Sequence, residues 1–413
     1  MGIVVQKFGG TSVGTIERIG RVADRIISYK EAGHQMVVVV SAMGKSTDVL
    51  VDMAKEISAH PDEREMDMLL STGEQVTISL LSMMLEKKGH RAVSLTGWQA
   101  GITTESVHGK ARIKHIDNER MKSELAEGNI VIVAGFQGIS EEGEITTLGR
   151  GGSDTTAVAL AASLKADKCE IFTDVSGVYT ADPRVVPAAQ KLDVISYDEM
   201  LELANLGAGV LHPRSVECAK KYGVCLVVRS SFTDEEGTYV QEGITLETGR
   251  VVSGVAHDED VAKITVVGMP AQVGTLSRLF NTLATHHVNV DIIIQSSYDA
   301  KASNISFTVA GSDLTHALQT LEVSRADLGF DKVEYEEALT KVSIVGAGMV
   351  NNPGVAAEMF RELAQQEISI KMVSTSDIKV SCVIASEYAD RAVRALHSIF
   401  QLDAQEVAVV HGI

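Results

Sequence analysis

Over residues 1 to about 250, short apolar runs alternate with longer amphipathic stretches, and this alternation most limits the possible folds. Five runs have the length and composition of buried strands, at residues 37–40, 92–95, 130–134, 169–172 and 225–228. Helix-like sequence or a glycine loop separates each run from the next, which is typical of a mainly parallel sheet flanked by helices. Hydrophobic residues form 45% of the chain and aromatics only 4%, which favours an aliphatic core.

The chain repeats itself beyond residue 260. The sequence KITVVG at 263–268 recurs as KVSIVG at 341–346. After a two-residue shift the match continues, with Gly274, Phe280, Leu283, Ala284 and Ser296 in the first copy and Gly354, Phe360, Leu363, Ala364 and Ser376 in the second. Each copy predicts a βαββαβ unit whose sheet can pair with its twin. We therefore expect three domains, at 1–250, 260–336 and 339–413. The two copies of the repeat serve either as a pair of small-molecule sensors or only as a dimerisation module.

A glycine-rich segment at 146–157, TTLGRGGSDTTA, predicts an anion site. Its glycines allow close approach of the backbone, and Arg150 can hold a carboxylate or phosphate through two parallel hydrogen bonds. The apolar run 157–164 that follows predicts a helix, with Ser153 or Asp154 as its N-cap. A helix N-terminus beside glycines and a fixed cation favours anion binding over an ordinary capped loop.

A second strand, glycine turn and helix begins at the N-terminus. Lys7 ends an apolar run, Gly9 and Gly10 break it, and Thr11 and Ser12 offer hydroxyls and an N-cap for the helix that follows. A third polar segment, Ser41 to Thr47, follows the valine run 37–40 and predicts another loop at a strand end. Although this segment contains GKST, Val39 stands where a P-loop requires glycine, so the chain is not a P-loop enzyme.

Charge and cysteine content exclude several classes of protein. The formal net charge of −18 argues against nucleic acid and anionic membranes as partners. The four cysteines show no C-x-x-C spacing, and we find neither a signal peptide nor an apolar run of about 18 residues. A cytoplasmic protein is the expectation.

Five motifs, in order along the chain, give it a close resemblance to the aspartokinase family. They are KFGGTS at 7–12, LSTGE at 70–74, GFQG at 135–138, LGRGGSD at 148–154 and FTDVSGVYTADPR at 172–184. The repeat resembles the paired ACT domains that carry feedback inhibition in that family. The resemblance implies an amino-acid-kinase fold and ATP-dependent phosphorylation of the β-carboxylate of L-aspartate, on the route to lysine, threonine and methionine.

The same resemblance implies roles for individual residues. Lys7, Gly9 and Gly10 bind the transferring phosphoryl group, and Asp154 organises Lys7. Arg150 holds the α-carboxylate of aspartate and Glu74 its α-amino group, with further hydrogen bonds from Ser41, Thr47 and Ser153. The nucleotide site includes Lys7, Gly10, Thr173, Asp174, Tyr179 and Arg184. Mg²⁺ binds through ATP, without direct protein ligands. His212-Pro213-Arg214 also fits the family pattern, but Pro213 suits the first position of a structural helix equally well.

The sequence indicates the identity of the effector amino acid less clearly than that of the substrate. The turn 269–274 lacks the acidic residue that threonine-binding members often carry, so we expect lysine, alone or together with threonine. The candidate contacts are Gln272, Asn289, Asp291, Gln295, Ser296 and Ser376. The expected assembly is a homodimer or higher oligomer through the ACT domains, with a separately made regulatory subunit left open. Two alternatives are a kinase acting on glutamate or N-acetylglutamate and a non-catalytic amino-acid sensor.

Overall fold

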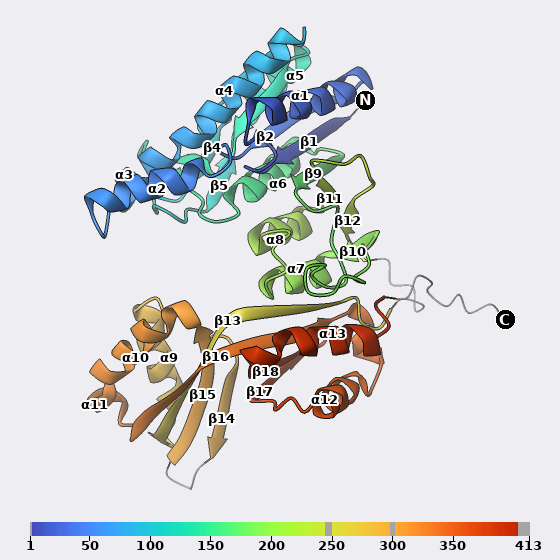
Figure 1. Ribbon diagram of the computed structural model, residues 1–413. Coiled ribbons are helices and arrows are strands. Elements are labelled where there is room, and N and C mark those ends of the chain that lie inside the picture. The colour runs from blue at the N-terminus through green and yellow to red at the C-terminus, as the bar shows by residue number, and fades with distance from the viewer. Residues whose placement is uncertain (1, 244–249, 298–301, 404–413) are drawn as a thin grey trace, which may run out of the picture. The chain divides into compact units, whose positions relative to one another are not determined.

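The computed structural model describes residues 2–243, 250–297 and 302–403, and the chain divides into two compact units (Figure 1). Unit 1 comprises Met1–Tyr179, Lys191–Asn205 and Gly209–Thr245. Unit 2 comprises Thr180–Gln190, Leu206–Ala208 and Leu246–Ile413. Two short segments from the N-terminal half of the chain therefore belong to the unit that holds the repeat.

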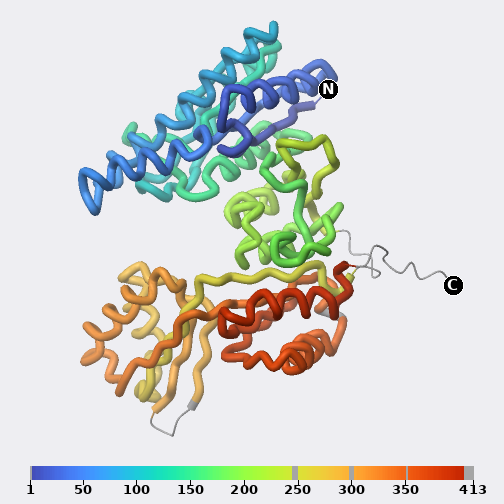
Figure 2. Tube along the Cα trace, in the orientation of Figure 1, coloured from blue at the N-terminus to red at the C-terminus, as the bar shows by residue number. Residues whose placement is uncertain are grey.

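Unit 1 is built on an eight-stranded sheet of order β10-β12-β11-β9-β1-β2-β6-β3. All neighbouring strands are parallel except β11 and β12. The strands are β1 (Ile3–Phe8), β2 (Gln35–Val40), β3 (Ala92–Leu95), β6 (Ile130–Ala134), β9 (Lys168–Thr173), β10 (Val194–Ser196), β11 (Leu226–Ser230) and β12 (Thr238–Gln241). Figure 2 shows the blue β1 beside the green β9, far along the chain. The five strands predicted from the apolar runs are confirmed.

Helices cover both faces of this sheet. On one face α1 (Ile16–Glu31) and α4 (Thr72–Lys87) share a core with β1, β2 and β6, while α6 (Gly152–Leu164) packs on β1, β2 and β9. The first helix begins after the N-cap Thr15, whose hydroxyl accepts from the Arg18 N–H, so the expected caps Thr11 and Ser12 were wrong. Thr15 directly precedes the amphipathic run, whereas the earlier hydroxyls lie in the turn. The other helices are α2 (Ser46–Ile57), α3 (Glu63–Leu70), α5 (Glu119–Ala126), α7 (Tyr197–Asn205) and α8 (Pro213–Tyr222).

A smaller sheet of order β5-β4-β7-β8 completes unit 1. Its strands are β4 (Ile102–Thr104), β5 (Ile113–Ile116), β7 (Gln137–Ser140) and β8 (Ile145–Thr147). The antiparallel pair β7 and β8 leads from the end of β6 to the start of α6, so the glycine-rich segment at 148–151 lies between a sheet edge and a helix N-terminus.

Unit 2 contains both copies of the repeat in one six-stranded sheet of order β14-β15-β13-β16-β18-β17. The two copies join through β13 (Gly254–Pro270) and β16 (Lys332–Val345), which confirms the expected pairing of the twin sheets. The remaining elements are β14 (Ile293–Ser297), β15 (Ala302–Ala310), β17 (Met372–Ser376), β18 (Lys379–Ala385), α9 (Thr275–Thr285), α10 (Leu314–Val323), α11 (Arg325–Leu328), α12 (Val355–Gln365), α13 (Ala389–Ile399) and the 3₁₀ turns Gly311–Asp313, Ala347–Asn351 and Ser386–Tyr388.

The two copies of the repeat match in their helix caps and buried residues as well as in the order of their elements. Gly274 and Gly354 cap α9 and α12 with φ of 91° and 105°, a conformation that favours glycine. Leu283 and Leu363 are both buried on the inner faces of those helices. The last strand expected in the second copy falls at 404–413, outside the described residues.

The segment 180–190 packs within unit 2. Ala181 and Val186 join the core of the second repeat, and the Thr180 Oγ1 lies 2.9 Å from Nε2 of the buried His397 on α13. Arg394 donates to the Val185 carbonyl at 3.0 Å. The end of the 172–184 motif is therefore held by the C-terminal repeat.

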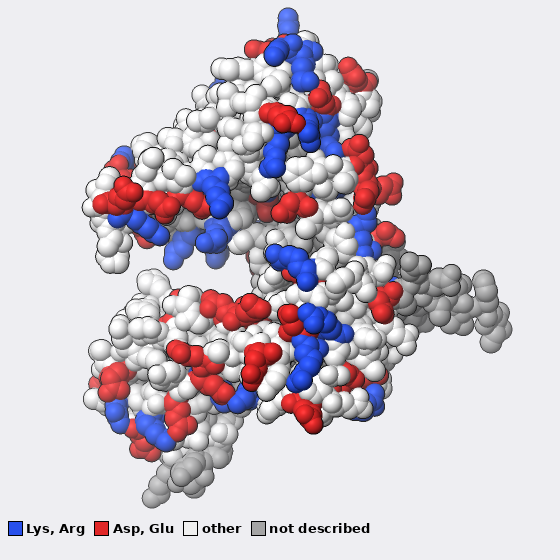
Figure 3. Space-filling view, in the orientation of Figure 1, with Lys and Arg blue, Asp and Glu red and all other residues white. Residues whose placement is uncertain are grey.

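On the face in Figure 3, acidic side chains are spread over both units and interspersed with lysines and arginines. One helical stretch, Glu63–Lys87, has the length and composition of a membrane span, but core helices pass the same test and this one carries the buried Asp67 and Glu74.

Candidate active site

The carboxyl ends of parallel strands bring the polar loops of unit 1 together. Phe8 and Val40 are paired at the ends of β1 and β2, so the loops that follow both strands leave the sheet at one edge. A Cβ on Gly10 would lie 2.8 Å from the Ala42 carbonyl oxygen, which shows how closely the two loops pack. Only glycine allows this approach, as the sequence pattern indicated.

A cavity of about 920 Å³ opens beside these loops. It gathers seven of the nine residues expected to bind the substrate or the phosphoryl group: Lys7, Ser41, Thr47, Glu74, Arg150, Ser153 and Asp154. They come from β1, α2, α4, α6 and the intervening loops, up to 147 positions apart in sequence, counting from Lys7 to Asp154. Tertiary folding has thus made one site of four separate segments of the chain.

Lys7 and Asp154 form an ion pair inside this cavity. The Lys7 Nζ lies 2.6 Å from the Asp154 Oδ1, and each side chain is 12% exposed. Asp154 lies in the first turn of α6, whose N-cap is Gly151 at φ 67°. The expectation that Ser153 or Asp154 caps this helix was wrong, because the glycine backbone turns the chain earlier and frees both side chains for the cavity. The positive end of the α6 dipole adds to Lys7 in favouring an anion.

Glu74 is a buried carboxylate with unused hydrogen-bonding capacity. It is 3% exposed, and its Oε1 accepts from the Ala42 N–H at 3.1 Å. Among the described residues the Oε2 has no partner. Burial raises the pKa of this group to about 7, since desolvation penalises the charged form. The site therefore contains an uncompensated carboxyl group that a ligand cation would satisfy.

The remaining cavity residues differ in how firmly they are held. Ser153 packs tightly, since a Cβ on Gly135 would lie 2.7 Å from its Cβ. Thr47 lies in the first turn of α2 rather than in the expected loop, because α2 begins at Ser46 directly after the tight turn. The Arg150 side chain makes no hydrogen bond or ion pair with another described residue, and it lines the cavity from an exposed position. It is available to a ligand carboxylate.

Of the residues expected at the nucleotide, Lys7 lines this cavity and the other five do not. Gly9 and Gly10 lie in the adjoining turn, and Thr173 ends β9, next to β1, with its hydroxyl 3.0 Å from the Asp174 Oδ1. Tyr179 also belongs to unit 1, but Arg184 belongs to unit 2, where its guanidinium pairs with Asp182 at 2.6 Å.

Several cavity residues escaped sequence reasoning. Asp48, Asp52 and Lys55 line it from α2, and their spacing of four and three residues places them on one helix face, a signal that the sequence contained. Phe136 lies in the GFQG motif and Thr147 in the glycine-rich segment 146–157, but neither was assigned a role, and Asp67 gave no such signal because it lies within an ordinary helix pattern. His212 is the N-cap of α8 and Pro213 its first residue, which confirms the structural role of that pair.

The expected effector residues lie in unit 2 and are exposed. Asp291 pairs with the buried Lys341 at 2.6 Å, and the Gln295 amide lies 3.4 Å from the Ser303 hydroxyl. Gln295 and Ser296 lie on the outer strand β14 and Ser376 on the opposite outer strand β17. Gln272 and Asn289 occupy loops of the first copy.

Comparison with protein families accounts for nearly the whole chain. A model of the amino acid kinase family matches residues 2–230, and an ACT domain model matches 264–324 and 342–400. The chain is 60% identical to an aspartokinase of Bacillus sp. strain MGA3 over 407 residues, covering 98% of this chain and 99% of that protein. It is 59% identical to aspartokinase 2 of Bacillus subtilis, covering 99% of this chain and all of that one.

Solved structures give the same result. The chain is similar to E. coli aspartokinase III in complex with aspartate and ADP, described as the R-state, with a TM-score of 0.82 and 29% identity. It is also similar to the complex of that enzyme with lysine and aspartate, described as the T-state, with a TM-score of 0.75. Each match covers 96% of this chain and 99% of the other.

Proposed function

We propose how individual residues of this chain, which belongs to the aspartokinase family, carry out its reaction. The chain phosphorylates the β-carboxylate of L-aspartate with ATP and yields 4-phospho-L-aspartate. This is the first step of lysine, threonine and methionine biosynthesis, and end-product amino acids regulate it through the ACT domains. The observation that carries the residue-level account is the cavity that places Lys7, Asp154, Glu74 and Arg150 around one space.

Phosphoryl transfer to a carboxylate needs charge placement rather than proton removal. The nucleophile is already ionised at neutral pH, so the enzyme must align two anions and offset their repulsion. Lys7, with the Gly9 and Gly10 N–H groups, binds the transferring phosphoryl group and stabilises its charge in the transition state. Asp154, 2.6 Å from the ammonium, holds Lys7 in place. The N-terminus of α6 adds a second source of positive potential.

The aspartate head group binds across the cavity. Arg150 pairs with the α-carboxylate through two parallel hydrogen bonds, and Glu74 receives the α-ammonium. The free Oε2 of Glu74 supports this assignment, since an incoming cation would satisfy it and restore the ionised form. Ser41, Thr47 and Ser153 line the same cavity and supply further hydrogen bonds.

The nucleotide binds through the unit 1 residues Lys7, Gly10, Thr173, Asp174 and Tyr179, and the role of Arg184, which belongs to unit 2, stays a prediction from the family resemblance. Support comes from the FTDVSGVYTADPR motif and from the adjacency of β9 to β1, which sets Thr173 beside the Lys7 strand. Mg²⁺ would bind through ATP, without a direct protein ligand, and would supply positive charge that offsets the charge of the phosphates.

Residues 1–250 form the catalytic domain in this account, and 260–336 and 339–413 form the two ACT domains. The effector is lysine, alone or together with threonine, with contacts among Gln272, Asn289, Asp291, Gln295, Ser296 and Ser376. The protein acts in the cytoplasm as a homodimer or higher oligomer through its ACT domains. A separately made regulatory subunit is compatible with this account and is not required by it.

A coupled assay of ADP release tests the function directly. Aspartate should support turnover, whereas glutamate and N-acetylglutamate should not. Faster turnover with either of the latter two would assign the chain to another amino-acid kinase activity. No ADP release with any of the three would leave a non-catalytic sensor.

A further inference from the structure

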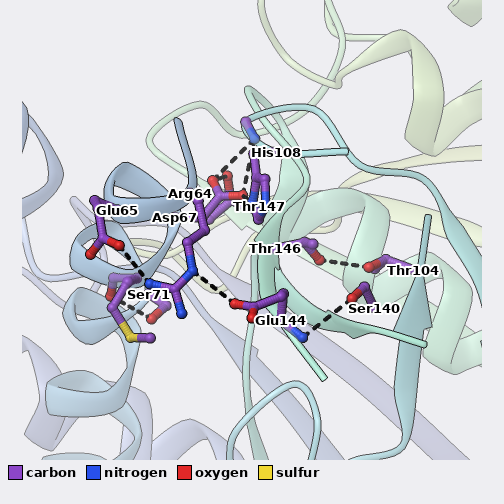
Figure 4. Close-up of polar contacts among 12 residues, drawn as sticks. Arg64, Glu65, Asp67, Ser71, Thr104, His108, Ser140, Glu144, Thr146 and Thr147 are labelled. Atoms are coloured by element: carbon purple, nitrogen blue, oxygen red, sulfur yellow. Dashed lines mark hydrogen bonds and ion pairs between the residues drawn. The ribbon is translucent and has the colours of Figure 1, made fainter. Parts of the chain in front are cut away.

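Asp67 is a buried carboxylate at the edge of the cavity that the account above does not use. It lies on α3 and is 0% exposed. In Figure 4 it points toward His108 and Thr147. The Thr147 hydroxyl donates to its Oδ1 at 2.5 Å, the Gly109 N–H lies 3.1 Å from both carboxylate oxygens, and the His108 Nδ1 lies 2.9 Å from Oδ2. A buried carboxylate is tolerated where its oxygens are satisfied in this way.

These partners lead directly to Arg150. Thr147 is the last residue of β8, three positions before Arg150. The Gly109 carbonyl faces the intervening residue Gly149, where a Cβ would lie 2.9 Å from that oxygen. The Ala111 N–H donates to the Thr147 carbonyl at 2.9 Å, so the loop at 108–111 is hydrogen-bonded to the end of β8 and also packs against Gly149. Asp67 thus holds both the 108–111 loop and Thr147, between which the segment that carries Arg150 begins.

A second clamp holds the same segment from another side. The Arg214 guanidinium, on α8, donates to the Leu148 carbonyl at 2.5 Å and to the Ala111 carbonyl at 2.9 Å. Asp67 and the half-buried Arg214 therefore each bridge the 108–111 loop and the segment that carries Arg150, Asp67 by accepting from N–H and O–H groups and Arg214 by donating to carbonyls. With Arg214 still in place, loss of Asp67 should displace the segment and leave the fold intact.

We propose that Asp67 is a positioning residue that sets Arg150 for the carboxylate of the substrate. It acts through Gly109 and Thr147. The inference rests on the proposed function, because it takes Arg150 as the group that receives the α-carboxylate of aspartate. A displacement of about 1 Å at such a group is enough to weaken binding strongly.

The test is Asp67→Asn, which keeps the side-chain shape but places an amide N–H₂ where an acceptor is needed. We expect the aspartate KM to rise about tenfold or more, with the ATP KM and kcat changed by less than about threefold. Glu144→Gln is the matched control. It removes an exposed ion pair, Arg64 Nε to Glu144 Oε2 at 2.9 Å, that ties the same helix to the β7–β8 turn. Its aspartate KM should stay within about twofold of the parent.

Arg150→Ala and the double variant separate this inference from the proposed function. If Arg150→Ala leaves the aspartate KM unchanged, the substrate-site assignment fails. If Arg150→Ala raises that KM but Asp67→Asn does not, only the positioning role is overturned. When Asp67 acts through Arg150, adding Asp67→Asn to Arg150→Ala should raise the KM no further. An additive increase would contradict the proposal.

Thr147 supplies a second route if Asp67→Asn does not fold. Thr147→Val removes only the hydroxyl that donates to Asp67, and it should raise the aspartate KM severalfold. Thr147→Ser restores the donor and should recover most of the lost affinity, which a role in packing alone would not produce. Equal aspartate KM values for the valine and serine variants would overturn the positioning role.

Discussion

Replacing Glu74 with glutamine should remove a pH-dependent cost of burying a carboxylate. Burial raises the Glu74 pKa from 4.5 to about 7, which corresponds to about 3 kcal/mol of disfavoured ionisation. The folded state holds this proton at pH values where the unfolded state has lost it. The stability contributed by Glu74 therefore falls as pH rises from about 4.5 to about 7 and is constant above that range. Glutamine does not titrate, so the Glu74→Gln protein should gain about 2.5 kcal/mol over wild type between pH 5 and pH 8.

The chain offers a local probe for this measurement. Trp98 is the only tryptophan and lies in unit 1, so its fluorescence during urea unfolding reports the unit that contains Glu74. Glu86→Gln, which replaces an exposed carboxylate on the same helix α4, is the control for the loss of a carboxylate without the cost of burial. A difference for Glu74→Gln that does not change with pH would refute the reasoning.

The same substitution, which should raise stability, should weaken the binding of aspartate. The ionised Glu74 is needed for the α-ammonium, so the wild-type aspartate KM should rise as pH falls below about 7, approaching tenfold per pH unit. In Glu74→Gln the aspartate KM should be high throughout and lack this dependence, while the ATP KM stays near that of wild type. A variant that keeps the wild-type pH profile would show that another group receives the ammonium.

Four further predictions concern phosphoryl transfer, substrate binding, stability and regulation. Lys7→Ala should lower kcat by at least about 100-fold, or about 3 kcal/mol, while leaving the fold intact, and near-normal turnover would rule out its assigned role. Arg150→Ala should raise the aspartate KM, and an effect confined to ATP would mean that the two sites are exchanged. Burial lowers the pKa of His397, so wild type should lose stability as pH falls below about 6.5, and His397→Gln should weaken that loss in urea unfolding at pH 5 and pH 8. Lysine, alone or with threonine, should inhibit the enzyme with a coupling energy of about 1 to 3 kcal/mol. Gln295→Ala should reduce this coupling energy without altering the uninhibited rate. If neither amino acid changes the activity or the melting temperature, the repeat is a dimerisation module.

Point substitutions test regulation better than truncation does. A cut near Glu247, which lies outside the described residues, would remove the repeat against which Ala181 and Val186 are buried. The segment 180–190 would then lose the hydrophobic core into which it packs. A loss of activity could follow either from that loss of packing or from the loss of the regulatory domains.

Local chemistry made much of the fold predictable. The valine run of β2 and the matched glycines at 274 and 354 impose their conformations through neighbours in sequence, so strands, turns and the repeat could be identified directly. Helix starts were harder, because any hydroxyl near an apolar run is a candidate cap. Thr15 and Gly151 capped α1 and α6 where Thr11, Ser12, Ser153 and Asp154 had been expected.

The sequence alone determined which chemical groups the site has available: a lysine at a strand end, a carboxylate in the first turn of α6, an arginine between glycines and a glutamate on α4. Only the tertiary structure decided what those groups experience. The distance from Lys7 to Asp154, the desolvation that raises the Glu74 pKa, and the hydrogen bonds that join Asp67 to Gly109 and Thr147 all depend on segments far apart in the chain. Burial and electrostatic interaction are properties of positions in space, and a periodic pattern along the chain carries no record of them.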